Sequence, residues 1–237
     1  MSDASAPSAI LWDLDGTLVD TAADIAAALN TTLQALGLSP LPLELVKTLI
    51  GRGAGVLLER ALAALKVEPA TLLQCPREAA LKQLLARFEQ AYLALEMDNH
   101  TQSACYPTVL STLATLEPRV PMAIVTNKPE AIAKLCAARL GLTAFIPILI
   151  GGDTLSVRKP HPDPLREACR RLKVAASAAL MVGDSHTDWA AAQAVPMRVA
   201  LLSYGYHAGI NVHALADVIA LERVSDLLSH FAWPVKP

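Results

Sequence analysis

Five short apolar runs, each ending in a polar or glycine-containing turn, constrain the fold of this chain more than any other feature. They lie at residues 9–12, 120–125, 146–150, 179–182 and 199–202. Runs of this kind are typical of strands buried on both faces of a sheet. Between the later runs, apolar residues spaced three and four apart predict helices at 130–140, 164–172 and 188–194. The alternation predicts an α/β fold with a parallel, Rossmann-like sheet, whose functional residues lie at the carboxyl ends of the strands.

The segment from residue 21 to 95 departs from this alternation. Its pattern predicts consecutive helices and no strand, with turns between them at 37–42 and 67–76. The predicted helices are 22–36, 43–50, 56–65 and 77–95. We therefore expect an all-helical cap domain at 21–95, inserted into a catalytic core formed by residues 1–20 and 96–237.

Charge and composition exclude several kinds of partner. The 20 basic and 22 acidic residues are mixed along the chain, so no basic stripe is present to bind a nucleic acid. The sequence contains no stretch of about 18 uninterrupted apolar residues, so it predicts no membrane span. The first residues do not resemble a secretory signal. The four cysteines are far apart, which predicts reduced side chains in a cytoplasmic protein.

Two carboxylates follow the first apolar run. Asp13 and Asp15 are two residues apart at a predicted strand end, so both side chains can face one site. Two converging carboxylates favour a hard divalent cation such as Mg²⁺. Gly16 permits a sharp turn beside them, and Thr17 adds a hydroxyl. By itself such a pair is also compatible with a plain turn or a helix cap.

The other predicted strand ends carry complementary groups. Thr126 follows the second run, Lys159 the third, and Asp184 the fourth, with Asp188 four residues later. Lys159 can neutralise phosphoryl oxygens, Thr126 can donate a hydrogen bond to one of them, and Asp184 can complete a metal site. Together these groups predict a phosphate site with its counter-ion.

Four motifs, in this order, resemble those of the haloacid dehalogenase superfamily over nearly the whole chain. They are Asp13-Leu14-Asp15-Gly16-Thr17-Leu18, Thr126-Asn127, Lys159-Pro160 and Gly183-Asp184-Ser185-x-x-Asp188. Within the superfamily the chain resembles phosphoglycolate phosphatases, through Ile50–Ala54, Tyr106-Pro107, Thr126–Pro129, Lys159–Leu165 and Tyr204–Tyr206. It departs from their pattern at Thr108, Ala194-Val195 and Trp189, which affects packing and turns rather than catalytic groups.

The resemblance implies a mechanism with a covalent aspartyl-phosphate. Asp13 would be the nucleophile and Asp15 the general acid and then the general base, assisted by Thr126 and Lys159. Mg²⁺ would be held by the carboxylates of Asp13 and Asp184 and by the backbone carbonyl of Asp15.

Further roles follow from the same resemblance. Asp188 would orient a metal-bound water from outside the ligand set, although a helix N-cap explains it as well. The candidate substrate-binding residues are Gly16, Thr17, Arg52 and Asn127. Arg52, between two glycines, could bind a substrate carboxylate or be an ordinary loop cation.

The favoured reaction is hydrolysis of 2-phosphoglycolate, a small phosphorylated metabolite, to glycolate and phosphate. A sugar-phosphate or amino-sugar-phosphate phosphatase and a phosphomutase are alternatives, because specificity resides in the cap. Two alternatives are not enzymes. A phosphoacceptor signalling module would be shorter and would lack the helical insertion. A catalytically idle binding protein would not need all the catalytic groups that this chain contains. A monomer and a homodimer are both compatible with the sequence.

Overall fold

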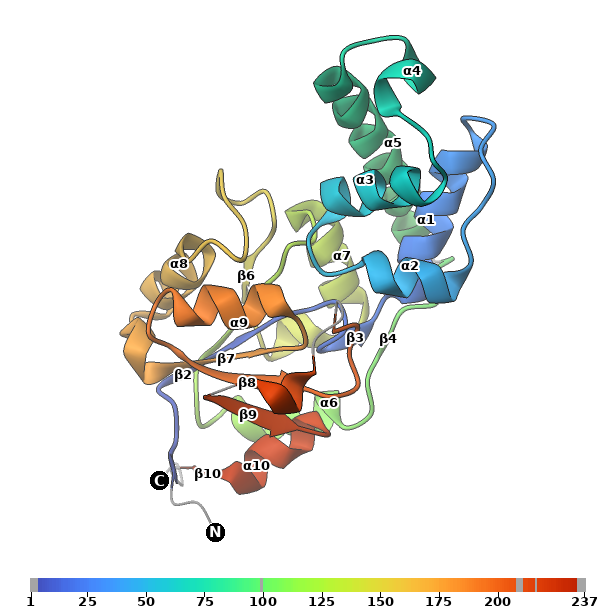
Figure 1. Cartoon of the computed structure of the whole chain (residues 1–237). Coiled ribbons are helices and arrows are strands. Elements are labelled where there is room, and N and C mark those ends of the chain that lie inside the picture. The colour runs from blue at the N-terminus through green and yellow to red at the C-terminus, as the bar shows by residue number, and fades with distance from the viewer. Residues whose placement is uncertain (1–3, 99, 208–210, 216, 234–237) are drawn as a thin grey trace.

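The computed structural model describes residues 4–98, 100–207, 211–215 and 217–233. Its centre is a six-stranded parallel sheet with the strand order β6-β5-β2-β7-β8-β9 (Figure 1). The strands are β2 (Ala9–Trp12), β5 (Met122–Val125), β6 (Ile148–Ile150), β7 (Ala179–Gly183), β8 (Arg198–Leu202) and β9 (Val218–Leu221). The predicted α/β class is confirmed. The sequence analysis missed β9, an edge strand whose first three residues are not fully buried.

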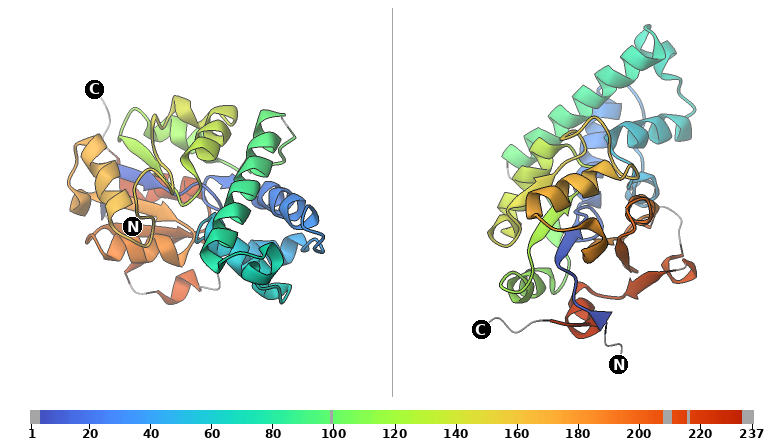
Figure 2. Two further views of the ribbon diagram at one scale, coloured as in Figure 1. Left: turned by 90° about the horizontal axis from the view of Figure 1, so that it is seen from above. Right: turned by 90° about the vertical axis from the view of Figure 1, so that its left-hand side faces the viewer.

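Helices cover both faces of the sheet, and the side chains of β2 alternate between them. Ile10 and Trp12 pack in a cluster with α6 (Val109–Leu116), α7 (Glu130–Arg139) and α10 (Leu227–His230). Ala9 and Leu11 pack in a second cluster with α8 (Asp163–Leu172) and α9 (His186–Gln193). Figure 2 shows these two helical layers on either side of the sheet. The central strand is therefore buried on both faces, as its continuous apolar run predicts.

The helical segment has a hydrophobic core of its own. It contains α1 (Ala22–Gln34), α2 (Leu43–Leu49), α3 (Ala54–Ala64), α4 (Pro69–Leu73) and α5 (Arg77–Met97). Leu29, Leu58 and Phe88 belong to its buried cluster, which also takes in Ile132 from α7. The segment lies to one side of the sheet (Figure 1). This separate core supports the proposed division into a cap at 21–95 and a core at 1–20 and 96–237.

One predicted turn was wrong in part, because residues 67–76 contain α4. This helix has a proline at its start, where a missing N–H costs nothing, and ends at Gln74 in the left-handed conformation. Five residues are too few for a helical period to be visible in the sequence. Helix α6 was also missed, and α9 begins at His186 rather than at Asp188.

Short elements join the larger ones. Strands β3 (Val19–Asp20) and β4 (Ala104–Cys105) pair antiparallel where the chain enters and leaves the helical segment. Strands β1 (Ala4–Ser5) and β10 (Phe231–Ala232) pair at the end of the molecule opposite α4 (Figure 1). The 3-10 helices are η1 (Leu142–Ala144), η2 (Ala176–Ala178), η3 (Val212–Ala214) and η4 (Val224–Asp226). Within the described ranges, no helix combines the length and apolarity that a bilayer crossing needs.

Candidate active site

The register of the central strands brings the predicted site residues together. Trp12 pairs with Ile124 of β5 and with Val182 of β7, so all three strands end at the same level. Asp13 follows β2 directly, and its backbone N–H donates to the carbonyl of Val182 at 2.8 Å. Thr126 and Asp184 follow the other two strands. Residues far apart in the sequence thus meet at the carboxyl edge of the sheet.

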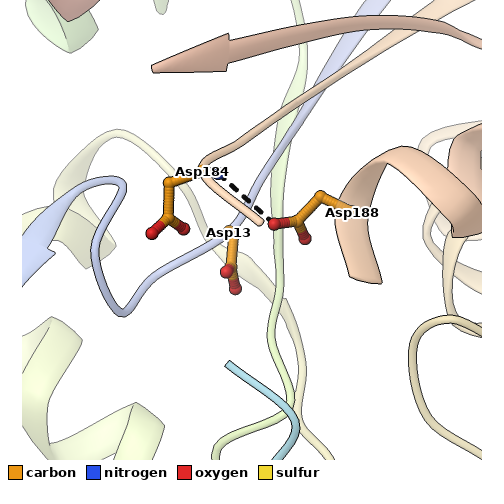
Figure 3. A group of neighbouring side chains, drawn as sticks. All are labelled: Asp13, Asp184 and Asp188. Carbon is orange, nitrogen blue, oxygen red and sulfur yellow. Dashed lines mark hydrogen bonds between the residues drawn. The ribbon is translucent and has the colours of Figure 1, made fainter. Parts of the chain in front are cut away.

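Three buried carboxylates form the centre of the site. Asp13, Asp184 and Asp188 each offer an oxygen, and these oxygens lie within 4.8 Å of one another (Figure 3). Burial raises the pKa of Asp13 to about 7, and the charge of Asp188 adds to this rise while Lys159 opposes it. Burial and the charges of Asp13 and Asp188 also raise the pKa of Asp184 well above its usual range. The cluster therefore has more negative charge than its neighbours neutralise.

Lys159 is a buried cation that faces this cluster. Its Nζ lies 2.9 Å from Asp13 Oδ1 and 2.7 Å from Asp188 Oδ1. Burial lowers its pKa, but the two carboxylates outweigh burial and raise it to about 12. Asn127 Nδ2 donates to the backbone carbonyl of Lys159 at 2.9 Å, which fixes the lysine next to the nucleophile candidate.

Asp188 has partners for both carboxylate oxygens. Its Oδ1 accepts from Lys159, and its Oδ2 accepts from the backbone N–H of Ser185 at 3.1 Å and from the Ser185 hydroxyl at 2.6 Å. These contacts form a capping box at the start of α9, with Ser185 as the N-cap and Asp188 at the third position. Asp188 thus joins the helix start to Lys159, and its predicted water-orienting role stays a prediction.

Asp184 is held by groups from two segments that are far apart in the sequence. Thr17 Oγ1 donates to its Oδ1 at 3.1 Å, and the backbone N–H of Tyr206 donates to its Oδ2 at 2.6 Å. A Cβ on Gly16 or on Gly205 would lie 2.3 Å from Asp184 Oδ2. The structure therefore places Gly16 and Thr17 against Asp184, and their predicted role in substrate binding stays a prediction.

Asp15 points toward a cavity beside the carboxylate cluster. Its Oδ1 accepts a hydrogen bond from Thr21 Oγ1 at 2.7 Å and forms an ion pair with Lys128 Nζ at 3.1 Å. The cavity is lined by Asp13, Asp15, Thr126, Asn127 and Lys159 from the sheet edge. Ile25, Ile50, Leu57, Phe88 and Tyr92 close it from the helical segment. The four predicted catalytic residues therefore share one cavity, whose opposite wall is mostly apolar.

Arg52 lies elsewhere. It lines a second cavity with Arg158, His186 and Thr187, and this cavity borders the first one at Lys159. Gly51 and Gly53, on either side of Arg52, do line the first cavity. The loop thus reaches the site through its backbone, and the predicted contact between Arg52 and a substrate carboxylate stays a prediction.

The sequence analysis did not assign site roles to Lys128, Tyr92, Thr21 or Tyr206. Lys128 is three residues past the end of a predicted strand, close enough to the predicted phosphate site to have been considered. The Tyr206 hydroxyl accepts from the backbone N–H of Thr21 at 2.7 Å and donates to Asp20 Oδ1 at 2.8 Å. These contacts depend on segments that meet only in the folded chain.

The cluster is suited to Mg²⁺. Its ligands are carboxylate oxygens, which this hard cation prefers. The raised pKa values of Asp13 and Asp184 indicate a site where a divalent charge would relieve repulsion between buried anions.

A parallel α/β fold with this ordered set of strand-end residues defines a class of hydrolase. The haloacid dehalogenase-like hydrolase family model matches residues 10–202, and the chain belongs to this family.

Several phosphoglycolate phosphatases are similar to this chain. That of Rhodospirillum rubrum is 42% identical over 96% of this chain and 90% of the relative. Phosphoglycolate phosphatase 1 of Pseudomonas aeruginosa is 38% identical over 94% of this chain and 79% of the relative. A crystal structure from Haemophilus somnus, described as a predicted phosphoglycolate phosphatase, matches with a TM-score of 0.81 and 30% identity, covering 94% of this chain and 96% of the other. These findings confirm the predicted resemblance and the predicted enzyme class, a phosphoric monoester hydrolase.

Proposed function

We propose that this enzyme hydrolyses 2-phosphoglycolate to glycolate and inorganic phosphate, with Mg²⁺ as cofactor and an aspartyl-phosphate on Asp13 as intermediate. The observation that carries the proposal is the shared cavity: Asp13, Asp15, Thr126 and Lys159 line it beside the cluster of buried carboxylates. The names of the relatives support the choice of 2-phosphoglycolate.

In the first step, a carboxylate oxygen of Asp13 attacks phosphorus while the bond from phosphorus to the glycolate oxygen breaks. Asp15 gives its proton to that departing oxygen. In the second step, Asp15 takes a proton from water, and the water oxygen attacks phosphorus. Inorganic phosphate leaves, and Asp13 is restored as a carboxylate.

The remaining groups position and neutralise the phosphoryl group. The ammonium of Lys159 and the hydroxyl of Thr126 are suited to its oxygens. Asp13, Asp184 and the backbone carbonyl of Asp15 would hold the cation. Mg²⁺ supplies positive charge that offsets both the carboxylates and the phosphoryl oxygens.

The helical segment forms an apolar wall of the cavity. Ile50, Leu57 and Phe88 bring apolar side chains from the helical segment to the reacting edge of the sheet. We infer that the segment acts as a cap over the substrate and excludes water. The cytoplasmic location and the choice between monomer and homodimer stay predictions.

Phosphate release from purified protein tests the proposal. The substrates are 2-phosphoglycolate, several hexose phosphates and glucosamine 6-phosphate, each with Mg²⁺ and with a chelator. We expect Mg²⁺-dependent selectivity for 2-phosphoglycolate, which Asp13→Asn abolishes. Asp98→Asn, at an exposed aspartate, is the matched control and should retain activity.

Each other result has a definite meaning. Selectivity for a sugar phosphate would keep the mechanism and overturn the substrate. Equal activity with a chelator would overturn the role of Mg²⁺, and turnover by Asp13→Asn would overturn the covalent intermediate.

A further inference from the structure

Lys128 is a buried cation beside the reacting groups, and the mechanism above gives it no role. Its side chain is 4% exposed. Its Nζ lies 3.1 Å from Asp15 Oδ1 and donates to the Tyr92 hydroxyl at 2.9 Å. The same atom is 4.1 Å from the centre of the Tyr92 ring, within the range of a cation–π contact.

Stability alone does not account for this arrangement. Removing an ammonium from water is costly, and a buried ion pair is often no more stabilising than apolar residues of similar volume. Apolar side chains already line the same cavity, among them Ile132 and Leu57. A charge kept there points to a function at the cavity.

The two carboxylate oxygens of Asp15 have different contacts. Thr21 and Lys128 both reach the same oxygen, Oδ1. Within the described residues, Oδ2 has no hydrogen-bond partner, although Asp15 lines the cavity. The two donors therefore make the oxygens of Asp15 different. Oδ1 is held by the protein, and Oδ2 is left to exchange a proton with a substrate.

Tyr92 connects this pair to the helical segment. It lies on α5, is 1% exposed, and packs edge-on against Phe88 with ring centroids 6.0 Å apart. Lys128 follows β5 at the sheet edge. The contact between them therefore joins the proposed cap to the carboxylate that would transfer the proton.

We propose that Lys128 is a positioning residue for Asp15. With Thr21 it holds Oδ1, so that Oδ2 faces the oxygen of the leaving group, and Tyr92 holds Lys128 from the cap side. The inference rests on the proposed function: the proton passes from Asp15 Oδ2 to the departing oxygen as the phosphorus–oxygen bond breaks.

The test compares two leaving groups in Lys128→Met, which keeps the length of the side chain and removes its charge. The rate of Asp13 phosphorylation is measured by rapid quench, at saturating substrate with Mg²⁺. Glycolate leaves poorly without a proton, whereas para-nitrophenolate leaves well without one. We expect phosphorylation by 2-phosphoglycolate to slow about 100-fold and that by para-nitrophenyl phosphate to slow less than about threefold, since general acid catalysis contributes about 10²–10⁴-fold.

Two further variants and a control complete the design. Lys128→Arg should recover at least about tenfold of the loss with 2-phosphoglycolate, because it restores a donor to Asp15. Tyr92→Phe keeps the ring and should show the same dependence on leaving group, with a smaller loss. Lys134→Met makes the same change at a side chain that is 61% exposed, and it should match wild type.

Equal slowing with both esters would overturn the proposal and leave Lys128 a structural role. A higher KM for 2-phosphoglycolate with kcat unchanged would also overturn it, since Lys128 would then bind the substrate carboxylate. If Lys128→Met fails to fold, the leaving-group comparison in Tyr92→Phe and Lys128→Arg decides. The proposed function is judged separately, from phosphorylation of the wild type, and its failure would overturn both.

Discussion

Gly16 and Gly37 have similar backbone conformations and very different surroundings. Their φ angles are +86° and +72°, a region that favours glycine. A Cβ on Gly16 would lie 2.3 Å from Asp184 Oδ2, whereas one on Gly37 would meet nothing within 4 Å. Alanine substitutions at the two positions therefore separate the effect of backbone strain from the effect of displacing Asp184, a candidate metal ligand.

Gly16→Ala should therefore lower activity and Mg²⁺ affinity, because Asp184 must move. Gly37→Ala should cost only the strain of the left-handed conformation, about 1 kcal/mol. Urea unfolding and titration of activity with Mg²⁺ measure the two effects. Unchanged Mg²⁺ dependence in Gly16→Ala would contradict the placement of Asp184 in the metal site.

Lys159 and Lys128 differ in how well a sequence motif predicts the role of each lysine. Lys159 stands in a recognisable motif, and the structure places its ammonium next to Asp13. Lys128 was quoted in a motif, but its partner Tyr92 lies on a helix 36 residues away in the sequence. A motif identifies a residue type near a site, and long-range contacts decide what that residue does.

At the scale of elements, the two connections to the helical segment are tied together. Strands β3 and β4 pair there. Asp24, 1% exposed on α1, accepts from the backbone N–H groups of Gln102 at 2.7 Å and Ser103 at 2.9 Å, and from the Ser103 hydroxyl. One buried carboxylate thus holds the returning chain against the start of the segment.

Asp24→Asn should destabilise the fold by about 2–3 kcal/mol, because an amide cannot accept from all these donors and leaves buried groups unpaired. Urea unfolding measures the difference. Asp98→Asn should change the free energy of unfolding by less than about 0.5 kcal/mol. A loss of the same size in both variants would show that the Asp24 contacts do not hold the connection.

At the scale of the whole molecule, the carboxylate cluster links stability to pH and metal. The pKa of Asp13 is about 7 in the folded protein, above its ordinary value of 3.8, so the folded state binds this proton more tightly than the unfolded state. Stability of the metal-free protein should therefore fall as pH rises from about 4 to about 7. The raised pKa of Asp184 acts in the same direction.

We expect the wild type in chelator to lose about 2 kcal/mol between pH 5 and pH 7 relative to Asp13→Asn, since one pKa unit corresponds to about 1.4 kcal/mol. Mg²⁺ should reverse this loss, adding about 2.7 kcal/mol at one hundred times its Kd. Thermal unfolding across pH, with and without Mg²⁺, measures both. If the stability of wild type and of Asp13→Asn changed with pH in the same way, the raised pKa of Asp13 would be contradicted.

The sequence by itself determined the fold class, the order of the strands along the chain and the residue types of the candidate site. It could do so because buried parallel strands appear as continuous apolar runs and because functional groups follow strand ends. It missed β9 and α4, because an edge strand and a five-residue helix have weak patterns, and it also missed the eight-residue α6. The division into core and cap stays a prediction, as do the catalytic roles, which the experiments above test.

Tertiary structure decided which of these groups touch. It placed Gly16 and Thr17 against Asp184, turned Arg52 into a second cavity, and brought Tyr92 to Lys128 and Asp15. Strand register and helix packing set these contacts over long sequence separations. A one-dimensional pattern records local period and residue type, so it predicts which strand ends share an edge of the sheet but not which individual side chains make contact there.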